Sequence, residues 1–487
     1  MSAVTTRWEP VVGIEVHVEL RTESKMFCGC AVSFGQTPNS NICPTCLALP
    51  GALPVTNRKA IDSIIAIGIS LNCEINEHSI FHRKNYFYTD LPKNYQISQF
   101  DLPVATDGWL EVDGGEGKRK IRIERAHMEE DTGKSTHVGA GGRIHTAEKT
   151  LIDFNRAGTP LVEIVSRPDI HSAPEARAYA QELRALVAEL GVSDARMEEG
   201  SIRFDANVSI RPEGSAELGT KVEIKNMNSF RSLERAVDHE LERQVSAQES
   251  DEVIFQETRH WDEASGTTTS MRGKEGSADY RYFPDPDLVP LRIDSAWVDR
   301  IRESLPELPA TRRSRYEGLG LDAHNAAVLA AAEPKLRQIY DAAVEAGADA
   351  ATAAIWTTGE VTAWLRRTET DPEQIDLDGP ALAKLVNMIE QGEVSASAAK
   401  EVLDGVLSGE GSPKDVAAAR DLIQVSDRSA VEEIVAAVLA DNPGAVTNYQ
   451  EGEQKVIGFL VGQVMRTSGG KADPKLANEI LREKLAR

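Results

Sequence analysis

The chain has 487 residues, of which 41% are hydrophobic and 27% are charged, and its formal net charge at pH 7 is −23. At roughly 150 residues per domain, this length predicts two to four domains. The acidic net charge repels polyanions at long range, so any nucleic acid must be recognised by a local surface of the protein. No apolar run approaches the roughly 20 residues of a membrane span, and the start MSAVTTRWEP lacks a secretory signal, so we expect a cytoplasmic protein without a membrane partner.

The first predicted element is a strand at residues 11–20, VVGIEVHVEL, in which apolar and polar side chains alternate without a break. Glu15, His17 and Glu19 fall on its polar face, and Glu19, nearest the strand end, is expected to be an ordinary carboxylate. The stretches KIRIERAHMEED, SIRFDANVSI and KVEIKN also alternate, which is typical of half-buried strands in an antiparallel sheet. A solvated acidic face is the alternative explanation for any one of these strands.

Several of these strands carry carboxylates, among them Glu129, Glu130 and Glu223. Converging carboxylates repel one another unless a cation lies among them. Mg²⁺, held by one or two carboxylates and by phosphate oxygens, is the usual cation in nucleotide chemistry. His17 would suit Zn²⁺ or Mn²⁺ better than Mg²⁺.

Four of the five cysteines form two close pairs, Cys28 with Cys30 and Cys43 with Cys46. Two such thiolate pairs suit tetrahedral zinc with no open position, so we predict a structural Zn²⁺ site. Reduced cysteines packed as small hydrophobic side chains are the alternative. Cys73 has no partner in the sequence and is expected in the core.

Two stretches raise the question of phosphate binding. FHRKNYFYTDLPKNYQISQF interleaves basic and aromatic side chains, which indicates either a surface that meets phosphates and bases or an aromatic-rich turn region. MEEDTGKST ends like a phosphate-binding loop but has Met128 where the first glycine is needed, so it is not a Walker A loop. Scattered basic residues remain as candidates for phosphate contacts: Arg125, Lys134, Lys221 and Lys225.

Helical signals divide the chain. Within the strand-rich part, Ser172 is a plausible N-cap of a helix that ends at Gly191, and a second helix begins near Ser229. After FPDPDLVPL the sequence becomes alanine-rich and helical to its end. We therefore predict an α+β domain at 1–295, a helical domain at 296–412 and a small helical tail domain at 413–487. The tail carries a local basic excess, for which a solvated helix face is the alternative.

Eight ordered blocks over nearly the whole chain closely resemble the family of the B subunit of aspartyl/glutamyl-tRNA amidotransferase (GatB). The blocks are VVGIEVHVEL, KMFCGC with PNSNICPTCLALPGALPV, HRKNYFYTDLPKNYQISQ, RAHMEEDTGKS, DFNRAGTPLVEIVSRPD, KVEIKNMNSF, DYRYFPDPDL and GFLVGQVMRTSGGKADPKLANEIL. The resemblance implies an antiparallel, cradle-like α+β domain, a helical domain and a tail that contacts tRNA. It also implies a ligase, in which ATP phosphorylates the side-chain carboxylate of mischarged Glu-tRNA(Gln) or Asp-tRNA(Asn) and ammonia then displaces phosphate.

The resemblance also implies roles for individual residues, by their position in the matching blocks. The implied catalytic residues, expected to hold Mg²⁺, are Glu15, His17 and Glu130, with Glu129 and Glu223 as second choices. The implied contacts to the nucleotide or the acyl end are Lys221, Lys225, Asn226 and Arg281. The implied tRNA contacts in the tail are Arg466, Lys471 and Lys475. ATP and Mg²⁺ are therefore the expected cofactors, beside structural Zn²⁺.

The chain offers no convincing nucleophile for releasing ammonia from glutamine. The resemblance implies that an amidase partner, the A subunit of the enzyme, supplies the ammonia through a channel and that a small C subunit completes a heterotrimer. Some family members lack the four-cysteine block, so the chemistry does not require zinc. Two alternatives remain: a zinc-stabilised tRNA-binding adaptor without chemistry of its own, and a metallohydrolase that uses Glu15 and His17 without the usual helical histidine pair.

Overall fold

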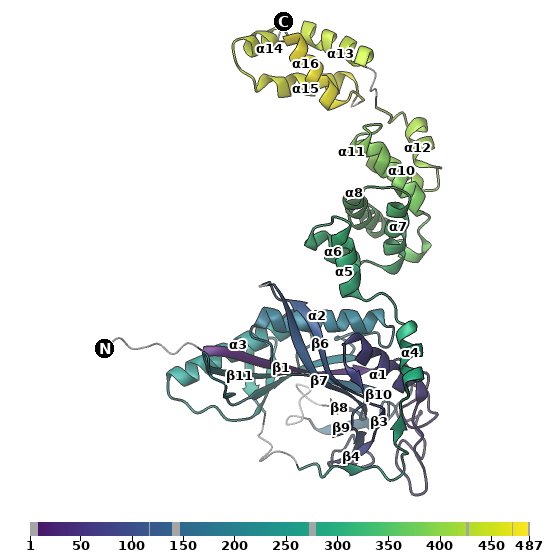
Figure 1. The fold of residues 1–487 in the computed structure, drawn as a ribbon, viewed down its shortest axis with the longest axis vertical. Coiled ribbons are helices and arrows are strands. Elements are labelled where there is room, and N and C mark those ends of the chain that lie inside the picture. Colours follow the sequence, from purple (N-terminus) through teal and green to yellow (C-terminus); the bar gives the residue numbers. More distant parts are fainter. Residues whose placement is uncertain are drawn as a thin grey trace, which may run out of the picture. The chain divides into compact units, whose positions relative to one another are not determined.

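The computed structural model describes residues 8–115, 117–138, 147–271, 279–424, 428–469 and 471–485. The chain divides into two compact units, Met1–Pro309 and Ala310–Arg487. The first unit combines sheets with helices, and the described part of the second is helical, which confirms the predicted α+β class (Figure 1). Among the described helices, none has both the length and the hydropathy needed to cross a membrane.

A nine-stranded sheet forms the centre of the first unit, in the order β14-β13-β12-β11-β1-β10-β7-β6-β2. Its strands are β1 (Trp8–Glu19), β2 (Glu74–Ile75), β6 (Ala105–Asp113), β7 (Lys118–Glu130), β10 (Pro160–Ser166), β11 (Ile202–Pro212), β12 (Val222–Lys225), β13 (Thr258–Asp262) and β14 (Thr267–Ser270). Adjacent strands of this sheet pair antiparallel, except that β12 and β13 run parallel. The strands predicted by alternation are confirmed as β1, β7, β11 and β12.

Three small sheets accompany the central one. The first has the order β15-β4-β5 (Phe283–Pro284, His82–Asn85, Tyr95–Ser98). The others pair β16 (Leu291–Arg292) with β3 (His78–Ser79) and β8 (Lys134–Val138) with β9 (Lys149–Asp153). Because β5 packs against β7, the predicted basic and aromatic segment lies beside the central sheet.

Helices cover one face of the central sheet. They are α1 (Arg58–Ser70), α2 (Ala173–Glu189) and α3 (Phe230–Glu249), which contact β7, β6 and β11 respectively, while α4 (Ser295–Glu303) packs on α1. Figure 1 shows α2 and α3 along one side of the sheet and β4, β8 and β9 on the other. Ser172 is confirmed as an N-cap, since it accepts from the Glu175 amide. The helix predicted to begin near Ser229 is also confirmed, and Ser229 caps it by accepting from the Ser232 amide. The apolar face of the sheet and these helices share one core, which leaves the other face of the sheet available for polar side chains.

The second unit is built from short helices. They are α5 (Pro309–Gly318), α6 (Ala323–Ala330), α7 (Pro334–Glu345), α8 (Ala350–Ile355), the π-helix η2 (Trp356–Val361), α9 (Thr362–Thr368), the 3-10 helix η3 (Pro372–Gln374), α10 (Gly379–Glu390), α11 (Ala396–Leu407), α12 (Pro413–Ala419), α13 (Arg428–Asp441), α14 (Pro443–Gln450), α15 (Val456–Thr467) and α16 (Pro474–Leu485). Their buried apolar side chains form two clusters, from Tyr316 to Ala417 and from Val431 to Leu485. The domain boundaries at 295 and 412 stay predictions.

Candidate active site

The polar face of the central sheet carries a row of titratable side chains from four adjacent strands. His17 of β1 lies opposite Glu163 of β10 on one side and Arg203 of β11 on the other. Glu163 in turn lies opposite His127 of β7. Because side chains alternate along a strand, Glu15 shares this face with His17. Strand register therefore gathers charged groups from distant parts of the sequence.

Two of these side chains, together with Glu129 of β7, form a group that can hold a metal ion. His17, Glu129 and Glu163 each offer a ligand atom, and these atoms lie within 4.8 Å of one another. The closest contact joins Nε2 of His17 to Oε2 of Glu163 at 3.4 Å. Two of the three side chains are buried. One imidazole and two carboxylates suit a divalent cation such as Mg²⁺ or Mn²⁺.

The two carboxylates of this group favour the ionised form. Burial opposes ionisation of Glu129, but the Lys84 ammonium and the neighbouring imidazoles of His127 and His17 hold its pKa below the ordinary value. Burial likewise opposes ionisation of Glu163, and His127 and His17 outweigh it, so that the pKa of Glu163 falls to about 2. Metal ligands must be deprotonated, and both carboxylates meet this condition.

Hydrogen bonds fix the position of Glu129. The Ser98 hydroxyl donates to its Oε1 over 2.9 Å, and the Gln96 amide donates to its Oε2 over 3.1 Å. Lys84 Nζ lies 3.5 Å from Oε1. Ser98 and Gln96 come from β5 and are themselves buried, so the small sheet beside β7 holds this carboxylate rigidly.

The structure places the other predicted metal ligands elsewhere. Glu15 lies on the same face and accepts a hydrogen bond from the Asn207 amide at 2.9 Å, but it is outside the three-residue group. Glu130 follows Glu129 directly and points to the opposite face, where it pairs with Lys93 and accepts from the Ile97 amide. The structure thus joins His17 to Glu129, the second choice from sequence, and to Glu163, which sequence reasoning did not single out.

Glu19 differs from the ordinary strand-end carboxylate that the sequence suggests. Its side chain is 23% exposed and its Oε1 lies 4.0 Å from Arg156. Burial, and then the hydrogen bond and charge of Asp131, raise the pKa of Glu19 to about 8. Oδ2 of Asp131 lies 3.1 Å from Nη2 of Arg203. Glu19 and Asp131, with Arg156 and Arg203, therefore extend the row of charged side chains on the polar face.

A second charged group lies at the end of β12. Nζ of Lys225 is 3.0 Å from Oδ2 of Asp205 and 2.9 Å from Oε1 of Glu223. Burial opposes the ammonium form, but the two carboxylates raise the pKa of Lys225 above its ordinary value. Asn226 follows with a positive φ of 70°, and its amide donates to the Trp261 carbonyl at 3.3 Å.

One cavity of about 550 Å³ joins these two groups. Its polar lining comprises His17, Lys84, Gln96, Glu129, Asp131, Arg203, Asp205, Lys225, Asn226, Asn228 and His260. Its less polar lining comprises Tyr86, Leu161, Met197, Ile202, Phe204, Met227 and Met271, with Gly200. Two other predicted contacts are not part of this lining. Lys221 directly precedes β12 and is exposed, and Arg281 is 83% exposed and pairs with Asp279.

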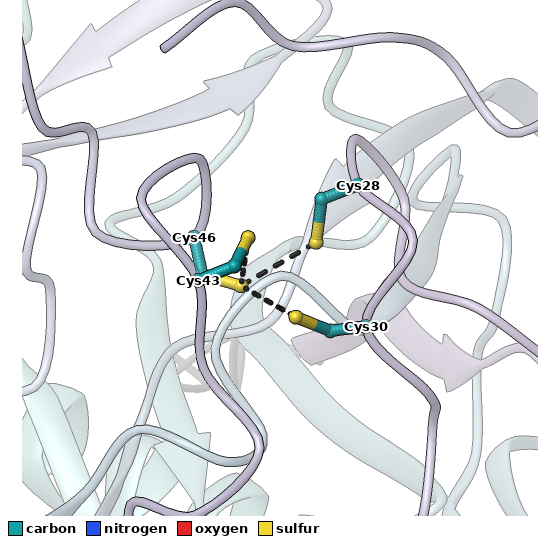
Figure 2. Close-up of side chains that lie close together, drawn as sticks. All are labelled: Cys28, Cys30, Cys43 and Cys46. Carbon is teal, nitrogen blue, oxygen red and sulfur yellow. Dashed lines mark hydrogen bonds between the residues drawn. The ribbon is translucent and has the colours of Figure 1, made fainter.

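The four clustered cysteines lie on two loops with their sulfurs turned toward one another (Figure 2). Sγ of Cys46 is 3.4 Å from Sγ of Cys28, 3.5 Å from Sγ of Cys43 and 3.6 Å from Sγ of Cys30. A tetrahedral Zn²⁺ with bonds of about 2.3 Å separates its sulfurs by about 3.8 Å, so the donor set fits one such ion. Cys73 is outside the cluster, and burial raises the pKa of its thiol to about 12.

Lys25 gives the cysteine cluster a nearby positive charge. Its side chain is almost fully buried, and Nζ lies 3.6 Å from Sγ of Cys46 and 3.0 Å from the Asn41 carbonyl. The Cys28 thiol, then a hydrogen bond with the Cys43 backbone and the charge of Lys25, lower the pKa of Cys46 to about 4 against the effect of burial. Cys28, Cys46, Lys93 and Glu130 are among the residues that line a small cavity beside the cluster.

The predicted tRNA contacts lie in the second unit. Arg466 lies in the last turn of α15 and is exposed, and Lys475 is exposed near the start of α16. Lys471, in the turn between these helices, pairs with Asp421. The predicted pair of helices around a glycine turn is confirmed, with Gly469 at a φ of 63°.

Comparison with known proteins gives matches over most of the chain. Residues 10–299 match the GatB/GatE catalytic domain and residues 338–485 match the GatB domain. The chain is 49% identical to the B subunit of aspartyl/glutamyl-tRNA(Asn/Gln) amidotransferase of Trichodesmium erythraeum, over 99% of this chain and 98% of that protein. It is 48% identical to the protein of the same name from Moorella thermoacetica, over 98% of this chain and 100% of that protein.

Proposed function

The chain belongs to the B-subunit family of the aspartyl/glutamyl-tRNA(Asn/Gln) amidotransferases, and we propose that the polar sheet face performs the chemistry of that enzyme. It is a subunit of a tRNA-dependent amidotransferase, a ligase-type enzyme that uses ATP. Its substrates are Glu-tRNA(Gln), Asp-tRNA(Asn) or both, and its products are the correctly charged Gln-tRNA(Gln) and Asn-tRNA(Asn). The observation that carries this assignment is the cavity in which His17 and Glu129 face Lys225.

The reaction has two steps. A carboxylate oxygen of the tRNA-linked amino acid attacks the γ-phosphorus of ATP, the bond to the bridging oxygen breaks, and ADP leaves with that electron pair. The nitrogen of ammonia then attacks the acyl carbon, the carbon–oxygen bond breaks, phosphate leaves, and the nitrogen loses a proton. The first step brings two anions together, so positive charge must surround the transferring group.

The chain's own residues supply that environment. We assign His17, Glu129 and Glu163 as holders of Mg²⁺, which offsets phosphate charge when bound. Glu15 is the nearest further candidate on the same face. Lys84 and Lys225 provide ammonium groups for the phosphate or acyl end.

The cysteine cluster and the helical tail lie outside the polar sheet face and have other roles. We assign structural Zn²⁺ to the four cysteines, and tRNA contacts to Arg466, Lys471 and Lys475 of the tail. The domains are residues 1–295, 296–412 and 413–487. The amidase, which is the A subunit, supplies ammonia and a small C subunit completes the heterotrimer, which works in the cytoplasm where translation takes place.

The test uses the assembled complex with ammonium chloride as nitrogen donor, so that glutamine hydrolysis by the partner plays no part. Mischarged tRNA should stimulate ATP consumption, and His17→Ala and Glu129→Gln should abolish it. The surface variant Lys118→Met, whose lysine is 57% exposed at the start of β7, serves as the control. A wild-type complex that consumes no ATP would instead indicate an adaptor without chemistry.

A further inference from the structure

The cavity contains a lysine in a place that a metal ion could take. Nζ of Lys225 lies between Oδ2 of Asp205 and Oε1 of Glu223, at 3.0 and 2.9 Å. A third carboxylate, Glu15, lies opposite Asp205 in the register of β1 and β11. An ammonium held between two carboxylates occupies a position in which carboxylates can also bind a divalent cation.

The rest of the cavity supplies only one metal-binding group. Among the described residues, the group on the polar sheet face is His17, Glu129 and Glu163, and the cysteine cluster lies apart from it. Lys225, Asp205, His17 and Glu129 all line the same cavity. Many phosphoryl-transfer sites surround the transferring group with two metal ions, whereas this cavity is lined by one metal-binding group and one ammonium fixed by carboxylates.

We propose that Lys225 is a catalytic residue that replaces a second metal ion in the phosphorylation step, an inference that rests on the function proposed above. Its Nζ donates hydrogen bonds to the γ-phosphoryl oxygens while the acyl oxygen bonds to phosphorus and ADP leaves. Lys225 stays protonated throughout, so no proton moves. Asp205 and Glu223 act as positioning residues that hold the ammonium in place.

The choice of lysine has a physical reason. A lysine ammonium is a compact point charge with three donors, which suits tetrahedral phosphate oxygens. Its side chain is 40% exposed, compared with 14% for Asp205 and 25% for Glu223. Lys225 and Asp205 both line the cavity, and the lysine is the most exposed of the three side chains.

The test removes the lysine and counts metal ions. Mn²⁺ is titrated into the assembled complex without nucleotide, and free Mn²⁺ is followed by electron paramagnetic resonance. Lys225→Ala vacates the carboxylates, so this variant should bind one more Mn²⁺ per complex than the wild type. The double variant Lys225→Ala/Asp205→Asn should lose the additional site, and Lys118→Met should match the wild type.

Kinetics of phosphorylation give the second readout. Lys225→Ala should slow ATP consumption with mischarged tRNA by about 10²–10³-fold, and raised Mn²⁺ should restore part of the rate in this variant but not in the double variant. An unchanged Mn²⁺ stoichiometry, or a wild-type rate without the lysine, would overturn the inference. If the wild-type complex itself consumes no ATP, the proposed function fails instead.

Discussion

Nε2 of His17 lies 3.4 Å from Oε2 of Glu163 across two neighbouring antiparallel strands. Each of these two side chains offers a ligand atom within 4.8 Å of that of Glu129, so all three can bind the same ion. Substitutions of His17 and Glu163 therefore test the assigned metal site directly.

Glu163→Gln should weaken Mn²⁺ binding by at least roughly 10-fold, because an amide carries no negative charge and binds divalent cations less tightly. The measurement is Mn²⁺ titration of the purified complex. Glu124→Gln, which changes a 44% exposed glutamate on β7, is the matched control. Equal affinities in the wild type and Glu163→Gln would remove Glu163 from the site.

Ser98→Ala should both destabilise the protein and loosen the metal site. The change leaves a buried oxygen of Glu129 without its 2.9 Å hydrogen bond, which costs about 1–3 kcal/mol of unfolding free energy. Ser98→Thr keeps the hydroxyl and should retain more of the Mn²⁺ affinity. Urea unfolding and Mn²⁺ titration of the three proteins check this, and identical affinities would show that Ser98 has only a structural role.

The cysteine cluster should hold one metal ion whose loss lowers stability. Cys46→Ser removes the sulfur that contacts all three others, so the variant should retain little zinc and melt at a lower temperature. Elemental analysis of chelator-free protein, together with thermal unfolding, measures both effects. Cys73→Ser should keep a full complement of zinc; wild-type protein without zinc would refute the assignment.

Stability should depend on pH through Glu19, whose folded pKa is raised to about 8. An acid with a raised folded pKa contributes stability that is complete below its ordinary pKa of about 4.5 and is lost as pH rises toward 8. Glu19→Gln imitates the protonated form and should flatten the pH dependence in this window. Thermal unfolding at pH 5 and pH 8.5 provides the comparison, and parallel losses in both proteins would contradict it.

The tail should serve tRNA and not glutamine hydrolysis. Val416 and Ala417 belong to the preceding apolar cluster, and the last apolar cluster starts at Val431. A chain ending at Gln424 therefore removes the last cluster, with Arg466, Lys471 and Lys475, and keeps the preceding core. The truncated complex should need more mischarged tRNA for half-maximal rate but hydrolyse glutamine normally. An equal loss of both activities would contradict this division.

Alternation alone predicted the strands of the polar face, because each exposes one side and buries the other. It did not identify Glu163, which lies in the largely apolar run PLVEIV of a central strand and contacts His17 only through strand pairing. The preference for Glu130 over Glu129 came from the family resemblance, whereas the structure groups Glu129 with His17 and Glu163. Adjacent residues face opposite sides of a sheet, so a shift of one position exchanges the two faces.

The parallel pairing of β12 and β13 has a consequence for ligand binding. The chain leaves β12, turns at Asn226, enters α3 and returns as β13 beside β12, which is a β-α-β unit inserted into an otherwise antiparallel sheet. In such units ligands bind beyond the carboxyl end of the strand, and the residues there, Asn226 to Asn228, line the cavity. The fold thus combines the antiparallel wall that carries His17 with the local architecture of nucleotide-binding α/β proteins.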